Sequence, residues 1–396
     1  MECEGARRAR RDRVADQPTA VWLDSIAATQ GIPNSATHRA MGLAEHLDQA
    51  LVQAAGQPMV VQIVIYNLPG RNCGRMASDG ELGPSDLPRY KTEFIDPIAE
   101  ILGRPAYANL RIVTVIEPDS LPNLVTSTGS RVSATPLCNT MLANGGYLNG
   151  VGYALAKLGA LPNVSNYLDV SHHGIIGWAD DLASTVDVLA QAARASGSTM
   201  ATVRGFVTNT ANYAALREPF IPMTDPYRFS RWVDFNQFND ELTFAQGMRI
   251  QLAGAGFAPS IGFLVDTSRN GWGGPTRPVG PSRSTDPNTF VDESRIDRRI
   301  SKTNYCNQAG AGLGERPTAA PADGIHAYAW IKPPGESDGP SAMIPEMAFD
   351  RMCDPTYTGA PRATDTRTGA LPGAPAAGAW FPAQFQQLMQ NAYPPL

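Results

Sequence analysis

The stretch that decides the fold of this chain is Arg111 to Leu121, which reads RIVTVIEPDSL. An apolar, β-branched run stops abruptly here at two acids that flank a proline, which is typical of a buried strand in a parallel sheet. Pro118 cannot donate a ladder hydrogen bond, so the strand should end there and place Asp119 at the mouth of the sheet. Asp119 is therefore the first candidate for a catalytic acid. The alternative is that Glu117 and Asp119 merely cap the following helix.

Apolar runs of the same kind recur along the chain, and each ends in a polar residue. They predict strands at Met59–Tyr66, Arg111–Ile116, Val164–Leu168, Val203–Val207, Ile261–Val265 and His326–Ile331. Apolar positions at helical spacing predict helices over Leu87–Leu102, Gly146–Leu158, Trp178–Ala193 and Asn236–Ala253. This alternation indicates βαβ units and a parallel sheet whose polar strand ends gather at one edge. Six or seven such strands favour an α/β barrel, with a doubly wound open sheet as the alternative.

The composition describes a large globular chain without a strong charge. Of 396 residues, 43% are hydrophobic and 17% charged. Since barrels of this size commonly form one domain, we predict a tail over residues 1–19 and a single domain over residues 20–396. The formal charge of -5 argues against nucleic acid or an anionic membrane as a partner. The sequence contains no apolar run of about 18 residues that could span a membrane, and a monomer is the default expectation.

The five cysteines indicate an oxidising compartment and not a metal site. None lies in a C-x-x-C pair or close to a histidine cluster, so we expect no metal. Four of them lie in Pro- and Gly-rich contexts that fit two disulfides, with three possible pairings, namely Cys73, Cys138, Cys306 and Cys353. Cys3 would be the odd one in the tail. Disulfides predict a secreted, extracellular protein, although residues 1–16 contain no apolar segment that could act as a signal.

No dinucleotide-binding glycine motif follows a predicted strand, so nothing supports a nucleotide cofactor. Six other segments carry a family resemblance, in the order Tyr66–Cys73, Ile116–Val125, Tyr167–Asp169, Thr208–Tyr213, Asp266–Gly271 and Trp330–Gly339. Together they are similar to glycoside hydrolase family 6, in particular to its bacterial cellobiohydrolases. The similarity is collinear from about Trp22 to Leu396. It implies a distorted, TIM-like barrel of about seven parallel strands with long active-site loops. It also implies inverting hydrolysis of β-1,4-glucosidic bonds in cellulose or cello-oligosaccharides, without a cofactor.

The resemblance assigns a pair of acids on opposite sides of the scissile bond, which inverting hydrolysis requires. Asp119 matches the general acid, which must stay protonated near neutral pH, and burial and a neighbouring carboxylate favour that state. Asp338 matches the candidate base, which Arg269 and Lys332 would hold ionised. Two further matches, to residues that handle the water and the distorted sugar, are Ser78 and Tyr66.

A glucan-binding cleft also needs flat aromatic faces for the sugar rings and polar groups for the hydroxyls. The matches to sugar platforms are Trp22, with Asp24 beside it, and Trp178. The matches to hydroxyl partners are Asp169, Asn209, Lys332 and Glu336. His172 is a further candidate for substrate binding, although a satisfied structural histidine is the stronger expectation for it and for His173.

Three positions depart from the family pattern. Asn72 stands where the family has an aspartate, and an amide cannot help the acid electrostatically to keep its proton. Tyr305 replaces a tryptophan platform and can still stack on a sugar, whereas Ile175 replaces another aromatic and cannot. We therefore expect a slow or altered member of the family.

The resemblance also implies the disulfide pairing and the mode of attack. Cys73 would pair with Cys138, and Cys306 with Cys353, which would pin the base of the Pro-, Ser- and Arg-rich stretch 273–304. That stretch is long enough to arch over the cleft so that a chain end is threaded through it. Release of cellobiose from chain ends, by resemblance the non-reducing ones, is thus the preferred prediction. The alternatives are an endo-acting β-1,4-glucanase and a catalytically impaired glucan-binding form.

Overall fold

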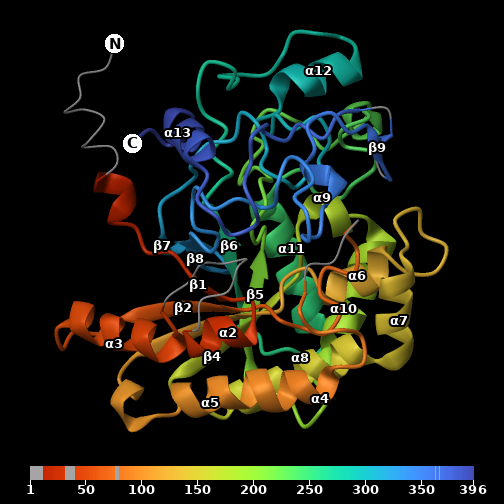
Figure 1. The fold of residues 1–396 in the computed structure, drawn as a ribbon. Coiled ribbons are helices and arrows are strands. Elements are labelled where there is room, and N and C mark those ends of the chain that lie inside the picture. Colours follow the sequence, from red (N-terminus) through yellow and green to blue (C-terminus); the bar gives the residue numbers. More distant parts are fainter. Residues whose placement is uncertain (1–11, 32–40, 76–79, 362, 365) are drawn as a thin grey trace.

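The computed structural model describes residues 12–31, 41–75, 80–361, 363–364 and 366–396. Its centre is one curled sheet of eight strands in the order β1-β2-β3-β4-β5-β6-β8-β7 (Figure 1). The strands are β1 Val21–Leu23, β2 Val60–Ile65, β3 Arg111–Ile116, β4 Val164–Asp169, β5 Val203–Thr208, β6 Gly262–Asp266, β7 Thr318–Ala322 and β8 Ile325–Ala329. Every neighbouring pair from β1 to β8 is parallel, and β7 runs antiparallel to β8 at the edge.

All six predicted strands are present, with ends within about two residues of the predicted ones. The prediction missed β1, which is only three residues long, and β7, whose sequence TAAPA has no strand pattern. The alternation of strands and helices also stops after β6, because a long segment leads from β6 to the β7–β8 hairpin with only one helix in it.

The sheet forms a distorted barrel, and few hydrogen bonds join its first strand to its last parallel strand. Between the first and last parallel strands only Thr19 and Trp330 form a bridge among the described residues, and Ala20 N donates to Trp330 O at 3.3 Å. The predicted α/β barrel class is thereby confirmed. Within the predicted tail, Val14 is 7% exposed and packs in a cluster with Trp272 and Tyr213. Cys3 lies outside the described residues.

Most helices flank the outer face of the sheet, whereas α12 and α13 lie among the loops at the top of Figure 1, and each strand from β2 to β5 is followed by at least one helix. Their bounds are α2 Ile26–Gln30, α3 Leu43–Ala54, α4 Leu87–Arg89, α5 Asp96–Leu102, α6 Leu121–Thr126, α7 Pro136–Asn144, α8 Gly146–Gly159, α9 His173–Ile176, α10 Ala179–Ala192, α11 Glu241–Gly254, α12 Pro287–Ser294 and α13 Pro382–Gln390. A π-helical segment, Tyr90–Ile95, joins α4 to α5. The predicted start of α11 at Asn236 is wrong because the Asp240 side chain accepts from Thr243 N at 2.8 Å and caps the helix there.

Short elements complete the chain. They are the 3₁₀ turns Pro105–Tyr107, Met200–Thr202, Tyr227–Phe229 and Arg351–Cys353, and a small hairpin of β9 Gly359–Ala360 and β10 Ala363–Thr364. Both predicted disulfides are present, between Cys73 and Cys138 and between Cys306 and Cys353. The first ties the loop after β2 to α7, and the second ties two loops above the strand ends to each other.

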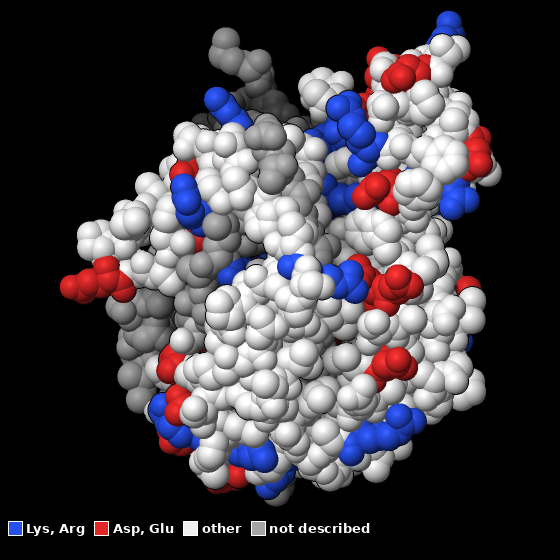
Figure 2. All heavy atoms as spheres, turned by 90° about the vertical axis from the view of Figure 1, so that its right-hand side faces the viewer, with Lys and Arg blue, Asp and Glu red and all other residues white. Residues whose placement is uncertain are grey.

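The core has two layers. Large apolar side chains such as Leu155, Phe206 and Phe244 fill the space between the sheet and the helices. A second cluster, which includes Trp22, Tyr66, Tyr167 and Leu264, fills the inside of the barrel. Among the described helices, none combines the length and the apolar character that crossing a bilayer requires. On the face shown in Figure 2, charged side chains are scattered over the lower half and gather around a hollow in the upper half.

Candidate active site

Polar residues at the carboxyl ends of the strands meet at one end of the barrel, where most of them anchor loops. Glu117, directly after β3, is 1% exposed. Its carboxylate accepts the N–H groups of Asn67 at 3.2 Å and Leu68 at 3.0 Å and the Tyr90 hydroxyl at 2.8 Å. Burial raises the pKa of Glu117 to about 7. Glu117 thus ties the loop after β2 to the end of β3.

Asp266 does the same at the end of β6. Its two oxygens accept the N–H groups of Ser268 at 3.0 Å, Ile331 at 3.3 Å, Ala211 at 2.9 Å and Lys332 at 3.0 Å. One buried carboxylate therefore fixes three loops. The strand-end residues act mainly as a scaffold, and the chemistry depends on the residues that this scaffold positions.

Asp119 is presented on a strained turn between β3 and α6. Glu117 and Asp119 have φ angles of 47° and 56°, in the left-handed region that non-glycine residues rarely adopt. Ser120 Oγ donates to Glu117 O at 2.5 Å, and the Asn123 side-chain amide donates to Asp119 O, so the turn is held by two bonds. The Asp119 side chain is 37% exposed, and its Oδ2 accepts from Arg75 Nη2 at 3.2 Å.

Neither acid caps the following helix, so that alternative is wrong. The N-cap of α6 is Ser120, and no side chain makes a cap bond there. Arg75 is a residue that the sequence analysis missed. It reaches Asp119 across 44 positions of sequence, and its guanidinium lies 5.1 Å from the centre of the Tyr305 ring.

Asp169, the last residue of β4, packs against Asp119. It is 3% exposed, and its Oδ1 accepts the N–H groups of Asp119 at 3.3 Å and Ser171 at 3.0 Å. Burial, and next the charge of Asp119, raise the pKa of Asp169 to about 7. The sequence analysis predicted a partner for sugar hydroxyls, but the structure makes Asp169 a buried neighbour of Asp119.

Asn209 is also placed differently from the prediction. It is fully buried, its amide nitrogen donates to Asp266 O at 2.8 Å, and its amide oxygen accepts from Ala214 N at 3.0 Å. Both ends of the side chain are engaged by backbone groups. Asn209 therefore holds the loop after β5 and has no free group for a sugar hydroxyl.

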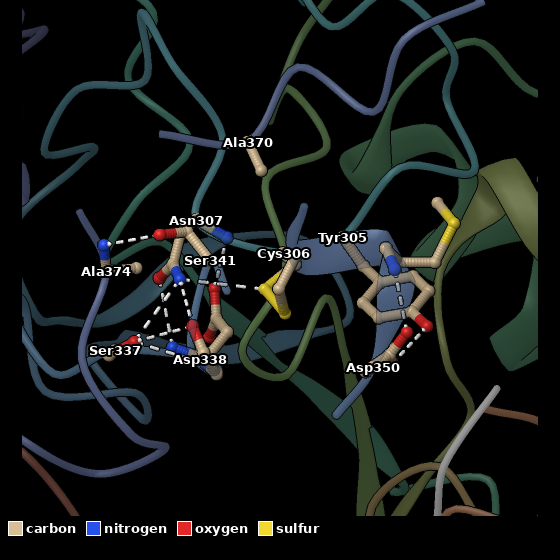
Figure 3. The surroundings of a disulfide bond; sticks show 12 residues. Tyr305, Cys306, Asn307, Ser337, Asp338, Ser341, Asp350, Ala370 and Ala374 are labelled. Atoms are coloured by element: carbon tan, nitrogen blue, oxygen red, sulfur yellow. Dashed lines mark hydrogen bonds between the residues drawn. A yellow bond between two sulfur atoms is a disulfide. The ribbon is translucent and has the colours of Figure 1, made fainter. Parts of the chain in front are cut away.

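Asp338 lies in the loop after β8 and is held as an ion. Arg269 Nη1 donates to its two oxygens at 2.9 and 3.0 Å, and Oδ2 also accepts from the Tyr213 hydroxyl at 2.7 Å and Asn307 N at 2.8 Å. Burial opposes ionisation, but Arg269, Lys332 and these hydrogen bonds outweigh it and lower the pKa of Asp338 below its ordinary value. Figure 3 shows Asp338 with Asn307 on one side of the disulfide of Cys306.

Tyr66 and Asn72 form a pair at the end of β2. The Tyr66 hydroxyl donates to Asn72 Oδ1 at 2.6 Å, and Asn72 is 1% exposed with a φ of 56°. The Arg71 guanidinium stacks 4.6 Å from the centre of the Tyr66 ring and donates to Asp24 O and Tyr66 O, each at 2.6 Å. Ser78 lies outside the described residues.

The predicted aromatic platforms lie at separate points along the cleft. Trp22 lies inside the barrel mouth, where its ring meets Tyr66 edge-on at 5.2 Å and Lys332 Nζ is 5.5 Å from the ring centre. The Tyr305 hydroxyl donates to Asp350 Oδ2 at 2.6 Å, on the other side of the disulfide from Asp338 (Figure 3). Trp178 Nε1 donates to Asp234 O at 2.7 Å.

These residues line three hollows that share walls and form one cleft. The first, of about 540 Å³, is lined among others by Trp22, Asp24, Tyr66, Asp119, Lys332, Glu336 and Asp338. Asp119 and Arg75 also line the second, together with His172, Ile175 and Tyr305. Thr303 lines both the second hollow and a third one, which contains Trp178. Ten of the predicted site residues line these hollows, with Asp119 shared by the first two, whereas Asn72, Arg269, Asp169 and Asn209 line none of them.

The wall opposite Asp119 is not the predicted one. Of the stretch 273–304, only Thr303 lines the first two hollows, whereas the first is lined by several residues between Ser337 and Asp350. The stretch instead lines the third hollow, with seven residues between Asp292 and Thr303. The buried Glu218 carboxylate fixes it there by accepting Ile296 N at 2.5 Å and Asp297 N at 2.7 Å. Loop length alone does not tell which of two loops covers a cleft.

One cluster among the described residues has the composition of a metal site, namely His172, His173 and Glu241. His173 Nδ1 lies 2.5 Å from Glu241 Oε1, and the other Glu241 oxygen accepts from the Thr208 hydroxyl. His172 Nδ1 accepts from Gly174 N at 3.2 Å. Because the candidate ligand atoms are bonded to one another or to the backbone, the arrangement is that of a structural network at the start of α9.

Three buried carboxyls predict that the free energy of unfolding decreases as the pH rises above about 5.5. Burial is the first cause that raises the pKa of Glu117 and of Asp169 to about 7 and that of Glu218 to about 8. A carboxyl with a folded pKa above its unfolded value stabilises the fold fully below the unfolded pKa, and this contribution is lost as pH rises through the folded pKa. Asp338, with a lowered pKa, loses its contribution only in acid, outside this window. We expect the free energy of unfolding to fall between pH 5.5 and pH 8.5, by roughly 2 to 3 kcal/mol for each of the three carboxyls.

Urea unfolding at several pH values between these limits measures this fall. Glu218→Gln should flatten the part of the slope that lies nearest pH 8, since glutamine does not titrate. A free energy of unfolding that stays constant or rises over this range would contradict the assignment of these three protonated carboxyls.

The molecule is a parallel, half-closed barrel with a long cleft across its strand ends. Aromatic rings lie along the cleft, and two carboxyls line the same part of it. This combination defines a polysaccharide-cleaving glycoside hydrolase. The sequence model of Glycosyl hydrolases family 6 matches residues 2–392. The chain belongs to this family.

Known relatives agree with this assignment. The chain is 46% identical over 398 residues to Exoglucanase A of Cellulomonas fimi, an alignment that covers 96% of this chain and 44% of that protein. It thus spans less than half the length of that relative. It is 35% identical over 387 residues to 1,4-beta-D-glucan cellobiohydrolase CEL6C of Podospora anserina, covering 97% of this chain and 79% of that protein.

Among solved structures, the catalytic domain of Cellulomonas fimi Cel6B matches 99% of this chain and 90% of that chain, with a TM-score of 0.92 and 45% identity. A mutant of the cellobiohydrolase Cel6A from Humicola insolens, in complex with methyl-tetrathio-alpha-d-cellopentoside, matches with a TM-score of 0.75 and 29% identity, covering 100% of this chain and 92% of that one.

Proposed function

We propose that this chain is an exo-acting, inverting β-1,4-glucanase that releases cellobiose from the non-reducing ends of cellulose and cello-oligosaccharides. The observation that carries the proposal is that Asp119 and Asp338 line the same hollow in opposite surroundings. Asp119 is partly exposed beside Arg75, whereas Asp338 is buried and ionised by Arg269. The names of the relatives, an exoglucanase and a cellobiohydrolase, support the substrate class.

In the proposed reaction, Asp119 gives its proton to the glycosidic oxygen as the bond to the anomeric carbon breaks. A water molecule attacks that carbon from the opposite face and loses a proton to the base, so the product is the α-anomer. Asp338 is the candidate base, and Ser78 and Tyr66 would position the water and the distorted sugar. The lowered pKa of Asp338 makes it a weak base that is ionised near neutral pH.

Sugar binding would be shared along the cleft. Four residues would hold the cellobiose unit that is released from the non-reducing end, because all of them line the hollow that contains Asp338. They are Trp22, Asp24, and Lys332 and Glu336, whose side chains are joined at 3.4 Å. On the other side of Asp119 the platforms are Tyr305 and Trp178, and Ile175 offers an apolar wall but no ring to stack on.

The exo mode and the site of action are parts of the same proposal. The Cys306–Cys353 disulfide and the Tyr305–Asp350 bond tie the two loops over the cleft together, which supports threading of a chain end. The two disulfides also support an extracellular location. We propose a monomer that needs no metal and no nucleic acid or membrane partner.

Hydrolysis of cellohexaose with anomer-resolved product analysis tests the proposal. The expected result is cellobiose released as the α-anomer, together with little loss of viscosity in carboxymethylcellulose. Release of the β-anomer would contradict inversion, and a rapid loss of viscosity would indicate the endo-acting alternative. Binding of cellohexaose without any product would identify a glucan-binding form.

A further inference from the structure

The third hollow, at the Trp178 end of the cleft, carries an excess of positive charge. We call it the entrance basin and define it by Arg131, Trp178, Arg231, Arg298, Lys302 and Thr303. Five Lys or Arg and three Asp residues line it in the part of the chain that the structure describes, and its volume is about 830 Å³. It lies beside the start of α10, on the side of the barrel that Figure 2 turns toward the viewer, where Lys and Arg gather around the hollow.

Only part of this charge is neutralised within the protein. Arg131 pairs with Asp181 at 2.7 Å, and Arg295 with Asp292 at 3.2 Å. Arg231, Arg298 and Lys302 have no carboxylate at salt-bridge distance among the described residues.

Lys302 is the most unusual of these cations because it is 8% exposed. Its ammonium group donates to Val233 O at 3.0 Å and lies 4.8 Å from the centre of the Trp178 ring. Burial lowers the pKa of Lys302 to about 8, and the nearby Asp234 only partly offsets it. A buried ammonium without an ion-pair partner is stabilised by any anion that enters the basin.

The other end of the cleft has the opposite charge. The hollow around Asp338 is lined by six acids and three bases, namely Asp24, Asp119, Glu336, Asp338, Glu346, Asp350, Arg71, Arg75 and Lys332. A neutral glucan is indifferent to this difference, whereas a glucan with a charged end is favoured in one direction and disfavoured in the other.

We propose that the entrance basin binds a carboxylate at the reducing end of a glucan chain, as in cello-oligosaccharides whose terminal sugar is oxidised to an aldonic acid. Lys302 and Arg231 would pair with the carboxylate while a neighbouring sugar stacks on the face of Trp178 that Lys302 leaves open. The inference rests on the proposed function, in which the non-reducing end occupies the acidic hollow and the reducing end trails toward the basin.

The test compares kcat/KM for cellohexaose and for its aldonic acid at low and high salt. At about 20 mM NaCl we expect the acid to be preferred by about threefold or more, and the preference to fall toward one at 0.5 M NaCl because exposed charges are screened. Lys302→Met and Arg231→Glu should each lower the ratio of acid to neutral substrate. Because the readout is a ratio, a general loss of activity in a variant cancels.

Arg228→Gln is the matched control, since Arg228 lies on the same loop as Arg231, pairs with Asp225 at 3.6 Å and does not line the basin. It should leave the ratio unchanged. A second substrate, with a glucuronic acid at the non-reducing end, should be poorer than cellohexaose. Equal gains from both acids would overturn the orientation that we propose, and an acid-to-neutral ratio of one at low salt would overturn the site itself.

Failure of the proposed function is a separate result. If cellohexaose is not hydrolysed, titration calorimetry can still compare the affinities of the protein for cellohexaose and for its aldonic acid. Tighter binding of the acid, weakened in Lys302→Met, supports the inference, and equal affinity for the two ligands overturns it.

Discussion

Replacing Asp119 with asparagine should lower kcat for cellohexaose by about a thousandfold, the usual range for loss of a general acid. Asparagine has nearly the same size and can keep a contact with Arg75, which lies 3.2 Å from the carboxylate. The left-handed φ of 56° also tolerates asparagine. The loss would therefore report the missing proton and not a collapsed turn. KM should change little, because the substrate is held mainly by the platforms on either side.

A substrate with an activated leaving group separates acid catalysis from other roles. The fluoride ion of β-cellobiosyl fluoride leaves without protonation, so Asp119→Asn should retain most of its activity on that compound. The matched control is Asp187→Asn, the same change on the exposed face of α10. An equal loss on cellohexaose and on the fluoride would show that Asp119 does not act as the acid.

The strands and the place of Asp119 at a strand end could be predicted because their signals are local. β3 is a continuous β-branched run from Ile112 to Ile116, and Pro118, two residues further on, cannot extend the ladder. The turn that presents Asp119 could not be predicted, because positive φ angles at Glu117 and Asp119 depend on bonds from Ser120 and Asn123. Side-chain contacts of this kind leave no periodic trace in the sequence.

The surroundings of the acids were the least predictable part. Arg75 reaches Asp119 from another loop, and Tyr213 and Asn307 reach Asp338 across 125 and 31 positions. The resemblance to a family pointed to Asp119 and Asp338 as candidate acid and base, but it could not show that Asp169 is buried against Asp119. The resemblance also could not show that both ends of the Asn209 side chain are hydrogen-bonded to backbone groups. The surroundings of Asp169 and of Asn209 both depend on tertiary packing.

Replacing Asn72 with aspartate should raise kcat for cellohexaose by about tenfold near neutral pH and extend activity to higher pH. The buried amide oxygen of Asn72 accepts from the Tyr66 hydroxyl at 2.6 Å, and a carboxylate oxygen can accept the same bond. Aspartate also tolerates the φ of 56°. The guanidinium of Arg71, which stacks on Tyr66 at 4.6 Å, would stabilise the added charge. Arg75, which donates its backbone N–H to Asn72 O at 2.9 Å and its guanidinium to Asp119, links this position to the acid. An ionised carboxylate added here favours the protonated form of the acid.

The pH profiles of kcat for the chain and for Asn72→Asp measure this effect, with Asn139→Asp on the exposed face of α7 as a control for net charge. The gain should be large for cellohexaose and small for cellobiosyl fluoride, since only the former needs a proton from Asp119. If both profiles coincide, the residue at this position does not tune the acid, and Asp169, once ionised, would be the neighbouring carboxylate that does. A gain confined to cellohexaose would instead identify Asn72 as a residue that limits turnover of this substrate.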